Sequence, residues 1–201
     1  MGGKFNLMID ASDLTDKMNT IREVLSDDGF KRLMERTFRE VAKKDRTIIY
    51  KAVKQDYVVK QGWAYQSIDS AKITVGNGVS CIIPLHGERG HIGQTFPATG
   101  SRRGWHIRSR YKVKAKIVTA NVSVLPDEME FGFPPFRNMP SSLGKVAFTR
   151  KGKGRHPIVS VAGLAFPQMP LNRSEDKTAD GLLEYAMDRL DHNFGFMFFK
   201  G

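Results

Sequence analysis

The spacing of apolar residues changes twice along this chain, and this change limits the possible fold more than any other feature. Apolar residues recur every three or four positions in residues 12–54, then tend to alternate with polar residues, and return to helical spacing in residues 176–194. A period near 3.6 marks one face of a helix, and a period of 2 marks one face of a strand. The order predicts an α+β fold, with N-terminal helices, a β-rich region over residues 57–163 and a C-terminal helix. With 201 residues, 40% of them hydrophobic, we expect a single domain.

Three helices are predicted from the apolar stripes. The first stripe consists of Leu14, Met18, Ile21 and Leu25. Ser12 or Asp13 is expected to cap this helix, and Asp27-Asp28-Gly29 is expected to end it. A second helix over residues 30–54 carries Lys and Arg opposite its apolar stripe. The third helix is followed by an apolar tail over residues 194–199, and we expect the sheet to cover the stripe formed by Leu182, Leu183, Ala186, Met187 and Leu190.

Between the helices, the chain has the alternation and turn residues of antiparallel strands. Strands are expected to begin after Gln55, with Trp63 among them. Gly76-Asn77-Gly78 accepts positive φ cheaply, so it predicts a hairpin of residues 70–75 and 79–85. Two later strands, 145–149 and 157–162, are joined by a basic loop. We therefore expect a mainly antiparallel sheet, sandwich or barrel-like, with long loops, among them an irregular excursion over residues 86–109 that is rich in glycine.

The positive charge of the chain is concentrated in its middle. The net charge is +11, and residues 86–174 contain 15 Lys or Arg against four acids, with no acid at all in residues 131–174. Such a surface should bind an anionic partner, either nucleic acid or an acidic protein face, and charge alone does not decide between them. Trp105 is the expected exposed aromatic anchor beside these cations. The candidate interaction residues are Arg102, Arg103, Trp105, Lys112, Lys114, Lys116, Arg150, Lys151, Lys153 and Arg155.

The sequence predicts no catalytic, metal or cofactor site. Cys81 is the only cysteine, so it forms no intrachain disulfide, and its place in a predicted strand favours a core role. The phosphate-loop pattern Gly-x4-Gly-Lys-Ser/Thr is absent, which argues against a nucleotide hydrolase. His86, Glu88 and His91 could be drawn as zinc ligands, but their stretch lacks a helical zinc-peptidase motif. No apolar run is long enough for a membrane span or a signal sequence, so we expect no membrane contact.

One segment carries a family resemblance. Residues 150–169 contain a basic strand end, the turn His156-Pro157-Ile158, a strand that ends near Gly163, and the exit Pro167-Gln168-Met169 into the C-terminal helix. This order resembles the hallmark segment of the phage minor tail protein Z family. Ile83-Pro84-Leu85 and Phe131-Gly132-Phe133 stand where the layout of that family places them.

The resemblance implies a non-enzymatic virion protein that completes the tail of a long-tailed bacteriophage at its head-proximal end. Its implied partners are further copies of itself in a ring, the tail tube, tail terminator or neck proteins, and passing viral DNA. The expected hexamer follows from the architecture of such tails. Assembly would occur in the bacterial host cytoplasm. The alternative from the residues themselves is a basic nucleic-acid-binding module, and a hydrolase has only scattered histidines to support it.

Overall fold

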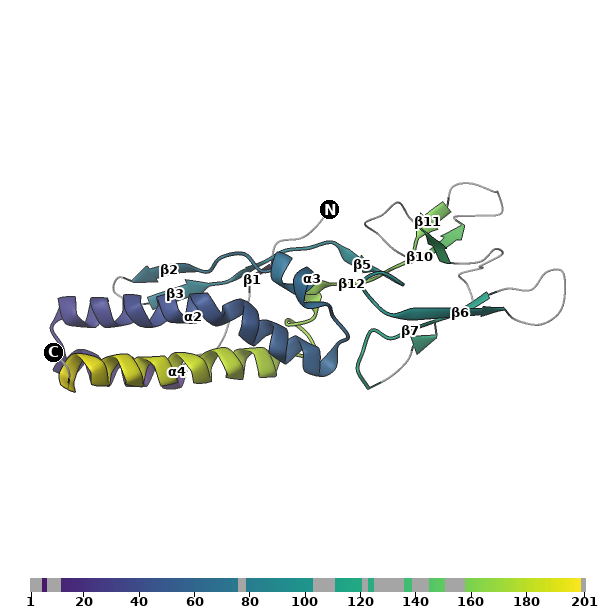
Figure 1. The fold of residues 1–201 in the computed structure, drawn as a ribbon. Coiled ribbons are helices and arrows are strands. Elements are labelled where there is room, and N and C mark those ends of the chain that lie inside the picture. Colours follow the sequence, from purple (N-terminus) through teal and green to yellow (C-terminus); the bar gives the residue numbers. More distant parts are fainter. Residues whose placement is uncertain are drawn as a thin grey trace.

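The molecule is elongated, with the long helices and a few short strands beside them at one end and the other strands extending to the opposite end (Figure 1). The computed structural model describes residues 5–6, 12–75, 79–102, 111–120, 123–124, 136–138, 145–150 and 158–199. The helices are α1 (Ser12–Val24), α2 (Asp27–Asp56), α3 (Gln61–Gln66) and α4 (Glu175–Phe199), and η1 (Phe166–Gln168) is a 3-10 turn. These helices and the small antiparallel sheets confirm the α+β class.

The break between α1 and α2 lies earlier than predicted. Asp27 and Asp28 do not end α1; they form the first turn of α2, and Ser26 is its N-cap. The Ser26 hydroxyl accepts a hydrogen bond from the Gly29 N–H at 3.3 Å. Carboxylates are favourable here because the free N–H groups give a helix N-terminus a partial positive charge.

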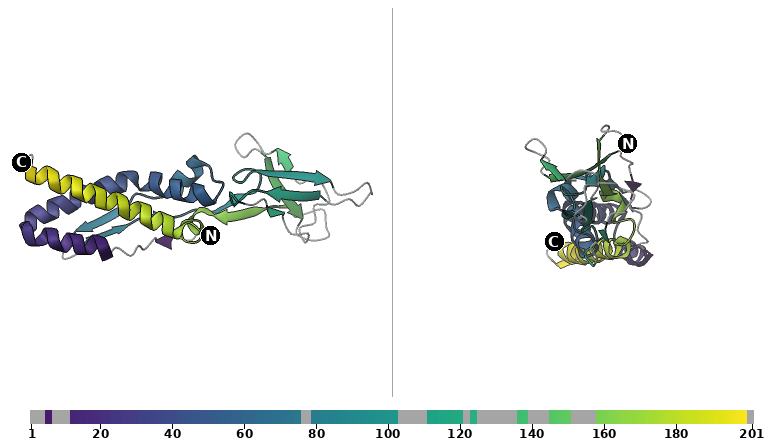
Figure 2. Two further views of the ribbon diagram at one scale, coloured as in Figure 1. Left: turned by 90° about the horizontal axis from the view of Figure 1, so that it is seen from below. Right: turned by 90° about the vertical axis from the view of Figure 1, so that its right-hand side faces the viewer.

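The apolar stripe of α4 packs along α2, and not on a sheet as predicted (Figures 1 and 2). Leu182, Ala186 and Leu190 are buried on this side of α4. The long stripe of α2 presents a matching apolar face that includes Leu33, Met34 and Val41, so helix packs on helix. The expected apolar tail continues α4 to Phe199. Within the described residues, no helix combines the length and hydropathy that crossing a membrane requires.

A helix also replaces part of the predicted strand region after Gln55. Trp63 lies in α3, and its ring contacts two other aromatic rings edge to face, Phe96 at 5.9 Å and Phe166 at 5.8 Å between centroids. Ala64 of the same turn is fully buried. These tertiary contacts override the β-branched composition of the flanking residues. Strand character is kept on each side, because Tyr57 and Ile68 each form an isolated bridge.

The strands form small sheets where a sandwich or barrel was expected. The strands are β1 (Phe5–Asn6), β2 (Lys72–Val75), β3 (Val79–Ile82), β4 (Pro84–Leu85), β5 (Arg89–His91), β6 (Ala98–Arg102), β7 (Tyr111–Ala115), β8 (Ser123–Val124), β9 (Phe136–Asn138), β10 (Lys145–Arg150), β11 (Ile158–Ser160) and β12 (Ala162–Ala165). Among them, β6-β7-β8 and β11-β10-β9 form three-stranded sheets, and β1-β4, β12-β5 and β2-β3 are pairs. Of these sheets, the β2-β3 pair lies against α2, and the three-stranded sheets lie at the opposite end of the molecule (Figure 1).

Both predicted hairpins are present. Strands β2 and β3 pair antiparallel from Lys72 with Ile82 to Val75 with Val79, as the Gly-Asn-Gly turn predicts. Strands β10 and β11 pair antiparallel from Phe148 with Ser160 onward. The turn residues 76–78 and the basic loop residues 151–157 lie outside the described residues.

The prediction of an irregular excursion over residues 86–109 is wrong for residues 86–102, the part that the structure describes. Strand β5 pairs with β12, strand β6 pairs with β7, and Ile92 and Phe96 are fully buried. The glycines were interpreted as a sign of irregularity, but they serve packing and a tight turn. Gly93 has φ +93°, a conformation that glycine adopts without strain, and its N–H donates to the Phe96 carbonyl at 2.8 Å.

The Phe96 ring joins two parts of the molecule. One part contains helices α1 to α4 and is called the helical end, and the other contains strands β6 to β11 and is called the distal strands. A Cβ atom on Gly90 would lie 2.9 Å from this ring, and one on Gly163 would lie 2.7 Å from it. Both distances are too short for real contacts, so the ring occupies space that only two glycines leave open. Trp63 covers a further side of the ring. The aromatic core of the joint therefore requires glycine in both β5 and β12.

Three backbone hydrogen bonds connect three segments beside this ring. The Ile92 N–H donates to the Val161 carbonyl at 2.9 Å, the Val161 N–H to Ala147 at 2.8 Å, and the Ala147 N–H to Ile92 at 2.8 Å. All three residues are buried. This closed set links the pair β12-β5 to strand β10, which belongs to a different sheet, and satisfies polar groups away from water.

We predict that Leu190→Ala lowers the free energy of unfolding by about 2–5 kcal/mol, because it leaves a cavity between α4 and α2. Urea denaturation of the purified chain measures this change. Leu183→Ala removes the same atoms from a half-buried position on α4 and should cost clearly less. Equal losses for the two variants would contradict the packing of α4 on α2.

We predict that Gly163→Ala destabilises the protein by about 1–3 kcal/mol, because the new methyl group overlaps the Phe96 ring. The cost should be smaller when Phe96 is already Leu, which a double-mutant cycle measures. Gly195→Ala is the control, since a Cβ at that helical position meets nothing within 4 Å and alanine favours the helix. An equal cost in both backgrounds would show that the ring is not what Gly163 accommodates.

Candidate interaction surface

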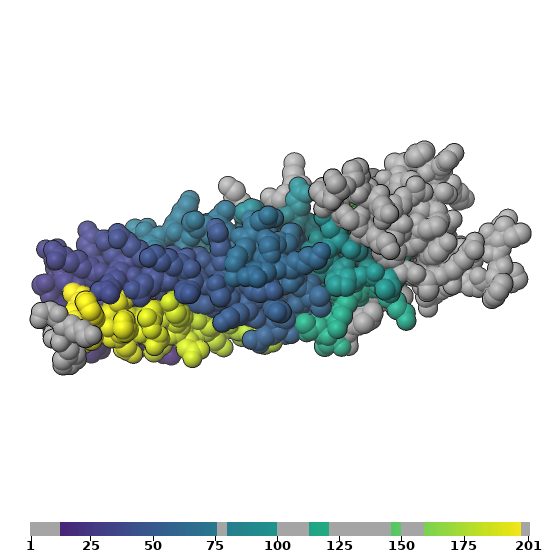
Figure 3. Space-filling model, viewed as in Figure 1, coloured from purple at the N-terminus to yellow at the C-terminus, as the bar shows by residue number. Residues whose placement is uncertain are grey.

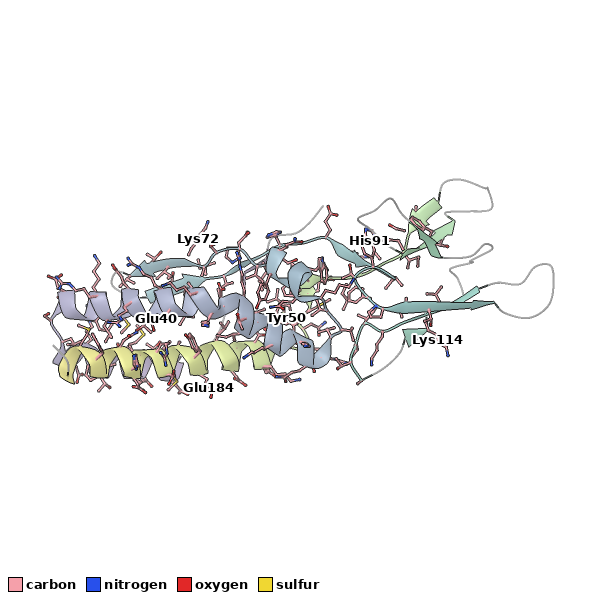
Figure 4. All side chains as sticks on the ribbon, viewed as in Figure 1. Glu40, Tyr50, Lys72, His91, Lys114 and Glu184 are labelled. Carbon is pink, nitrogen blue, oxygen red and sulfur yellow. The ribbon has the colours of Figure 1, made fainter. Side chains whose placement is uncertain are left out.

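The lysines of β7 occupy the exposed face of a strand, as their alternation predicts. Val113 and Ala115 are almost fully buried, and Lys114 and Lys116, between and after them, are exposed. Figure 4 labels Lys114 on this strand. In a strand, successive side chains point to opposite faces, so burial of one set directs the other to solvent. For Lys112, the structure describes the backbone position on β7, two residues before Lys114.

No acid stands opposite these lysines in the described ladders. Across the ladder with β6, Lys112 pairs with Ser101 and Lys114 pairs with Thr99. On the other side, Lys114 pairs with Val124 of β8. Within the described residues, no ion pair involves Lys114 or Lys116. Cross-strand partners of opposite charge would stabilise the sheet, and here hydroxyl and apolar residues take those places.

The remaining candidates fall into two groups. Arg102 ends β6, in the same sheet as the lysines, and Arg150 ends β10, in a different sheet at the same end of the molecule (Figure 1). The structure thus brings Arg102 and the β7 lysines into one sheet, and places Arg150 in its neighbour. Arg103, Trp105, Lys151, Lys153 and Arg155 lie outside the described residues.

The lysine-bearing sheet is fixed to the end of α2 by hydrogen bonds. The Val58 N–H donates to the Ile117 carbonyl at 2.8 Å, and the Thr119 N–H donates to the Asp56 carbonyl at 2.9 Å. The Thr119 hydroxyl also donates to the Gln55 carbonyl at 2.7 Å. The last carbonyls of a helix have no partner within the helix, so the segment after β7 satisfies those of α2. This position holds the β7 lysines close to the helical end.

The Asp56 carboxylate connects the C-terminal end of α2 to the start of α4. It accepts hydrogen bonds from the Lys177 ammonium at 2.6 Å and the Ser174 hydroxyl at 3.0 Å. The Lys177 hydrogen bond is the main cause that holds the pKa of Asp56 below its ordinary value, and the Ser174 hydrogen bond adds to it. An aspartate at the C-terminus of its own helix is unfavourable, but here it also lies at the N-terminus of α4, where a negative charge is favourable.

The residues weighed for chemistry form no site in the described structure. His86 contacts Asp69 at 3.2 Å, and no group of three metal-ligating side chains comes together among the described residues. Cys81 is half-buried, and burial, with a smaller effect from the charge of Asp45, raises the pKa of its thiol. A raised pKa disfavours the thiolate, which is the nucleophilic form.

A second cationic surface lies on α2, where the sequence predicts Lys and Arg opposite the apolar stripe, but none of these bases is among the candidate interaction residues. Its exposed bases include Arg32, Lys43 and Arg46. Counted along the sequence, these bases are cancelled by acids in other segments, so the middle of the chain alone looked basic. The spacing of these bases, every three or four residues opposite the apolar stripe, marks them as one surface of the helix.

No protein family model, no curated protein and no solved structure matches the chain.

We predict that Asp56→Asn lowers the free energy of unfolding at pH 7 by about 1–2 kcal/mol, because it weakens a charge-assisted hydrogen bond. Since the folded state lowers the pKa of Asp56, the stabilisation is present above about pH 4 and is lost as the pH falls below it. The difference between wild type and variant, followed by thermal unfolding, should therefore shrink towards pH 3. Asp16→Asn, at an exposed position of α1, is the control and should show neither effect.

Proposed function

We propose that the chain is a structural subunit of a long-tailed bacteriophage, a minor tail or tail-completion protein that forms a ring at the head-proximal end of the tail. The observation that carries the proposal is the order of elements in residues 158–199. The resemblance implies a strand that ends near Gly163, the exit Pro167-Gln168-Met169 and a terminal helix. Here β11 and β12, which contains Gly163, are followed by η1 and then by α4, and this order supports the proposal. No catalytic role is part of the proposal.

This segment has a structural role in the molecule. Phe166 and Met169 are fully buried, and the Gln168 side chain accepts a hydrogen bond from the Ala165 N–H at 3.0 Å, which holds the turn. Gly163 lies against the Phe96 ring. The segment that carries the resemblance thus forms the joint between the two ends of the molecule, which supports a protein whose function depends on holding two surfaces in a fixed relation.

The shape and charge of the chain also support a ring subunit. A ring of identical copies needs two different surfaces on each copy, so that contacts run head to tail. The chain is elongated and asymmetric, with a helical end and distal strands that differ in structure (Figure 1). In this proposal the cations of the distal strands contact an anionic partner. That partner is an acidic surface of the tail tube, tail terminator or neck proteins, or the viral DNA that passes through the tail. Six copies are proposed from the architecture of such tails, and assembly takes place in the bacterial host cytoplasm.

The alternative is a basic nucleic-acid-binding module, which the exposed Lys114 and Lys116 favour. Neutralisation of phosphates by lysines releases counterions, so such binding weakens steeply with salt. Light scattering combined with DNA binding at about 50 and 200 mM salt separates the two functions. A monomer that binds DNA in a salt-sensitive way supports the module, and a defined oligomer supports the tail protein.

We predict that changing both Lys114 and Lys116 to Gln leaves the fold intact but reduces the yield of infectious phage by about tenfold or more, because an anionic partner loses two contacts. Exposed substitutions away from special features change stability by only about 0.5 kcal/mol. Plaque titres and electron microscopy of particles measure the result, and tails that are incomplete or not joined to heads are expected.

The matched control changes Lys60 and Lys72, two exposed lysines of the helical end, to Gln. Normal titres are expected for this control. Normal titres and particles for both variants would refute the proposed role of the β7 lysines, and absence of the chain from purified virions would refute the proposed function itself.

A further inference from the structure

The outward side of α2 carries a continuous row of cations, which we call the cationic ridge. It consists of Arg32, Arg36, Arg39, Lys43 and Arg46, all exposed. Their spacing of three or four residues places them on one side of the helix, opposite the buried stripe that contains Leu33, Val41 and Ile49. Helix α2 lies along the face shown in Figure 3.

The cationic ridge is only partly neutralised within its own chain. Arg36 pairs with Glu40 at 3.7 Å, and Arg39 pairs with Glu35 at 3.4 Å. Arg32, Lys43 and Arg46 form no ion pair within the described residues. Like charges three or four residues apart on a helix repel each other, so a partner of opposite charge would remove an unfavourable interaction.

Helix α4 carries the complementary row, which we call the anionic ridge. It consists of Asp176, Asp180, Glu184, Asp188 and Asp191, all exposed. Asp191 pairs with Lys17 of α1 at 2.5 Å, and Asp188 pairs with its neighbour Arg189 at 2.5 Å. The other three acids form no ion pair within the described residues. They repeat every four residues, again a repulsive spacing.

The two ridges do not neutralise each other within one chain. Helices α2 and α4 meet through their apolar stripes, and each ridge lies on the side of its helix opposite that stripe. Figure 4 labels Glu184 on the side of α4 away from α2. Within the described residues, the ion pair that joins these helices, Lys177 with Asp56, has the reverse polarity, with the cation on α4. The members of each ridge without an ion pair in the described residues, Arg32, Lys43 and Arg46 on α2 and Asp176, Asp180 and Glu184 on α4, are therefore open to another molecule.

We infer that the cationic ridge of one copy binds the anionic ridge of a second copy of this chain. The ridges are opposite in charge and share a spacing of three to four residues. At a rise of about 1.5 Å per residue, the cationic ridge is about 21 Å long and the anionic ridge about 22 Å long. Two helices can thus lie side by side with their charges paired along the whole length.

An apolar residue lies beside the charged contact. Phe196 is 43% exposed, and the guanidinium of Arg36 lies over its ring at 4.8 Å from the centroid. A stable interface combines charged residues at its rim with a buried aromatic residue. The contact joins two different surfaces, so it is heterologous and repeats from copy to copy. The inference rests on the proposed function in one respect: the ring assigned to the tail protein is built through this contact.

The test uses charge reversal on the purified full chain. One variant carries Lys43→Glu and Arg46→Glu in the cationic ridge, and the other carries Asp180→Lys and Glu184→Lys in the anionic ridge. Sedimentation velocity over a range of protein concentrations measures self-association at low and high salt, and circular dichroism verifies the fold. We expect wild type to associate at low salt, and each variant alone to associate about tenfold more weakly or not at all.

The mixture of the two variants provides the decisive measurement. Each variant keeps intact the ridge that the other variant has altered, so a wild-type contact can form only between the two. The equimolar mixture should therefore associate although neither variant does so alone. Lys60→Glu with Lys72→Glu reverses the same number of charges elsewhere on the helical end and should associate like wild type. A wild type that stays monomeric at all concentrations, or a mixture that fails to associate, overturns the inference.

Two outcomes separate this inference from the proposed function. If the mixture associates but the chain is absent from purified virions, the ridge contact stands and the tail function falls. If the chain is present in virions but the variants associate like wild type, the tail function stands and the ridge contact is overturned. Loss of duplex DNA binding in the Lys43→Glu, Arg46→Glu variant, with self-association unchanged, would assign the cationic ridge to nucleic acid and likewise overturn the inference.

Discussion

The rest of the structure depends on the burial of one aromatic ring, that of Phe96. The ring lies where Gly90 and Gly163 leave room for it, and Trp63 of α3 covers it from the helical side. A side chain larger than hydrogen at either glycine would displace the ring. Because these contacts come from β5, β12 and α3, one packed ring fixes how the distal strands are oriented relative to the helices.

Features that depend on local pattern were predicted from the sequence. The stripes of α1, α2 and α4, the β2-β3 hairpin and the alternation of β7 all follow from residues close together in the chain. Features that depend on distant contacts were not. Gly90 looked like a loop residue, because the local sequence does not show that β5 pairs with β12 or that Phe96 also packs on Gly163, far along the chain. Helix α3 was missed for the same reason, since its rings pack on residues far along the chain.

The candidate surface was predicted in part. Exposure of Lys114 and Lys116 follows from the alternation, and the structure confirms it. The bases opposite the stripe of α2 were predicted, but they were left out of the interaction surface because a charge count along the sequence adds α2 to α1 and α4, whose acids cancel its bases. Charges that cancel in a sum can still lie on different sides of the molecule. Only the packing of α2 on α4 shows that the two signs face outward separately, where each can contact a partner.

The two charged regions are mechanically connected, and this connection explains why both can serve one assembly. Asp56 binds Lys177 of α4 through its carboxylate and Thr119 through its carbonyl, so the helical pair and the segment after β7 share one anchoring residue. The Phe96 joint provides a second connection. A contact made by the ridges therefore sets the orientation of the β7 lysines as well. In the proposed ring, every copy would place these lysines at the same level, and the repeated cations would form one continuous band facing an acidic neighbour or the passing DNA.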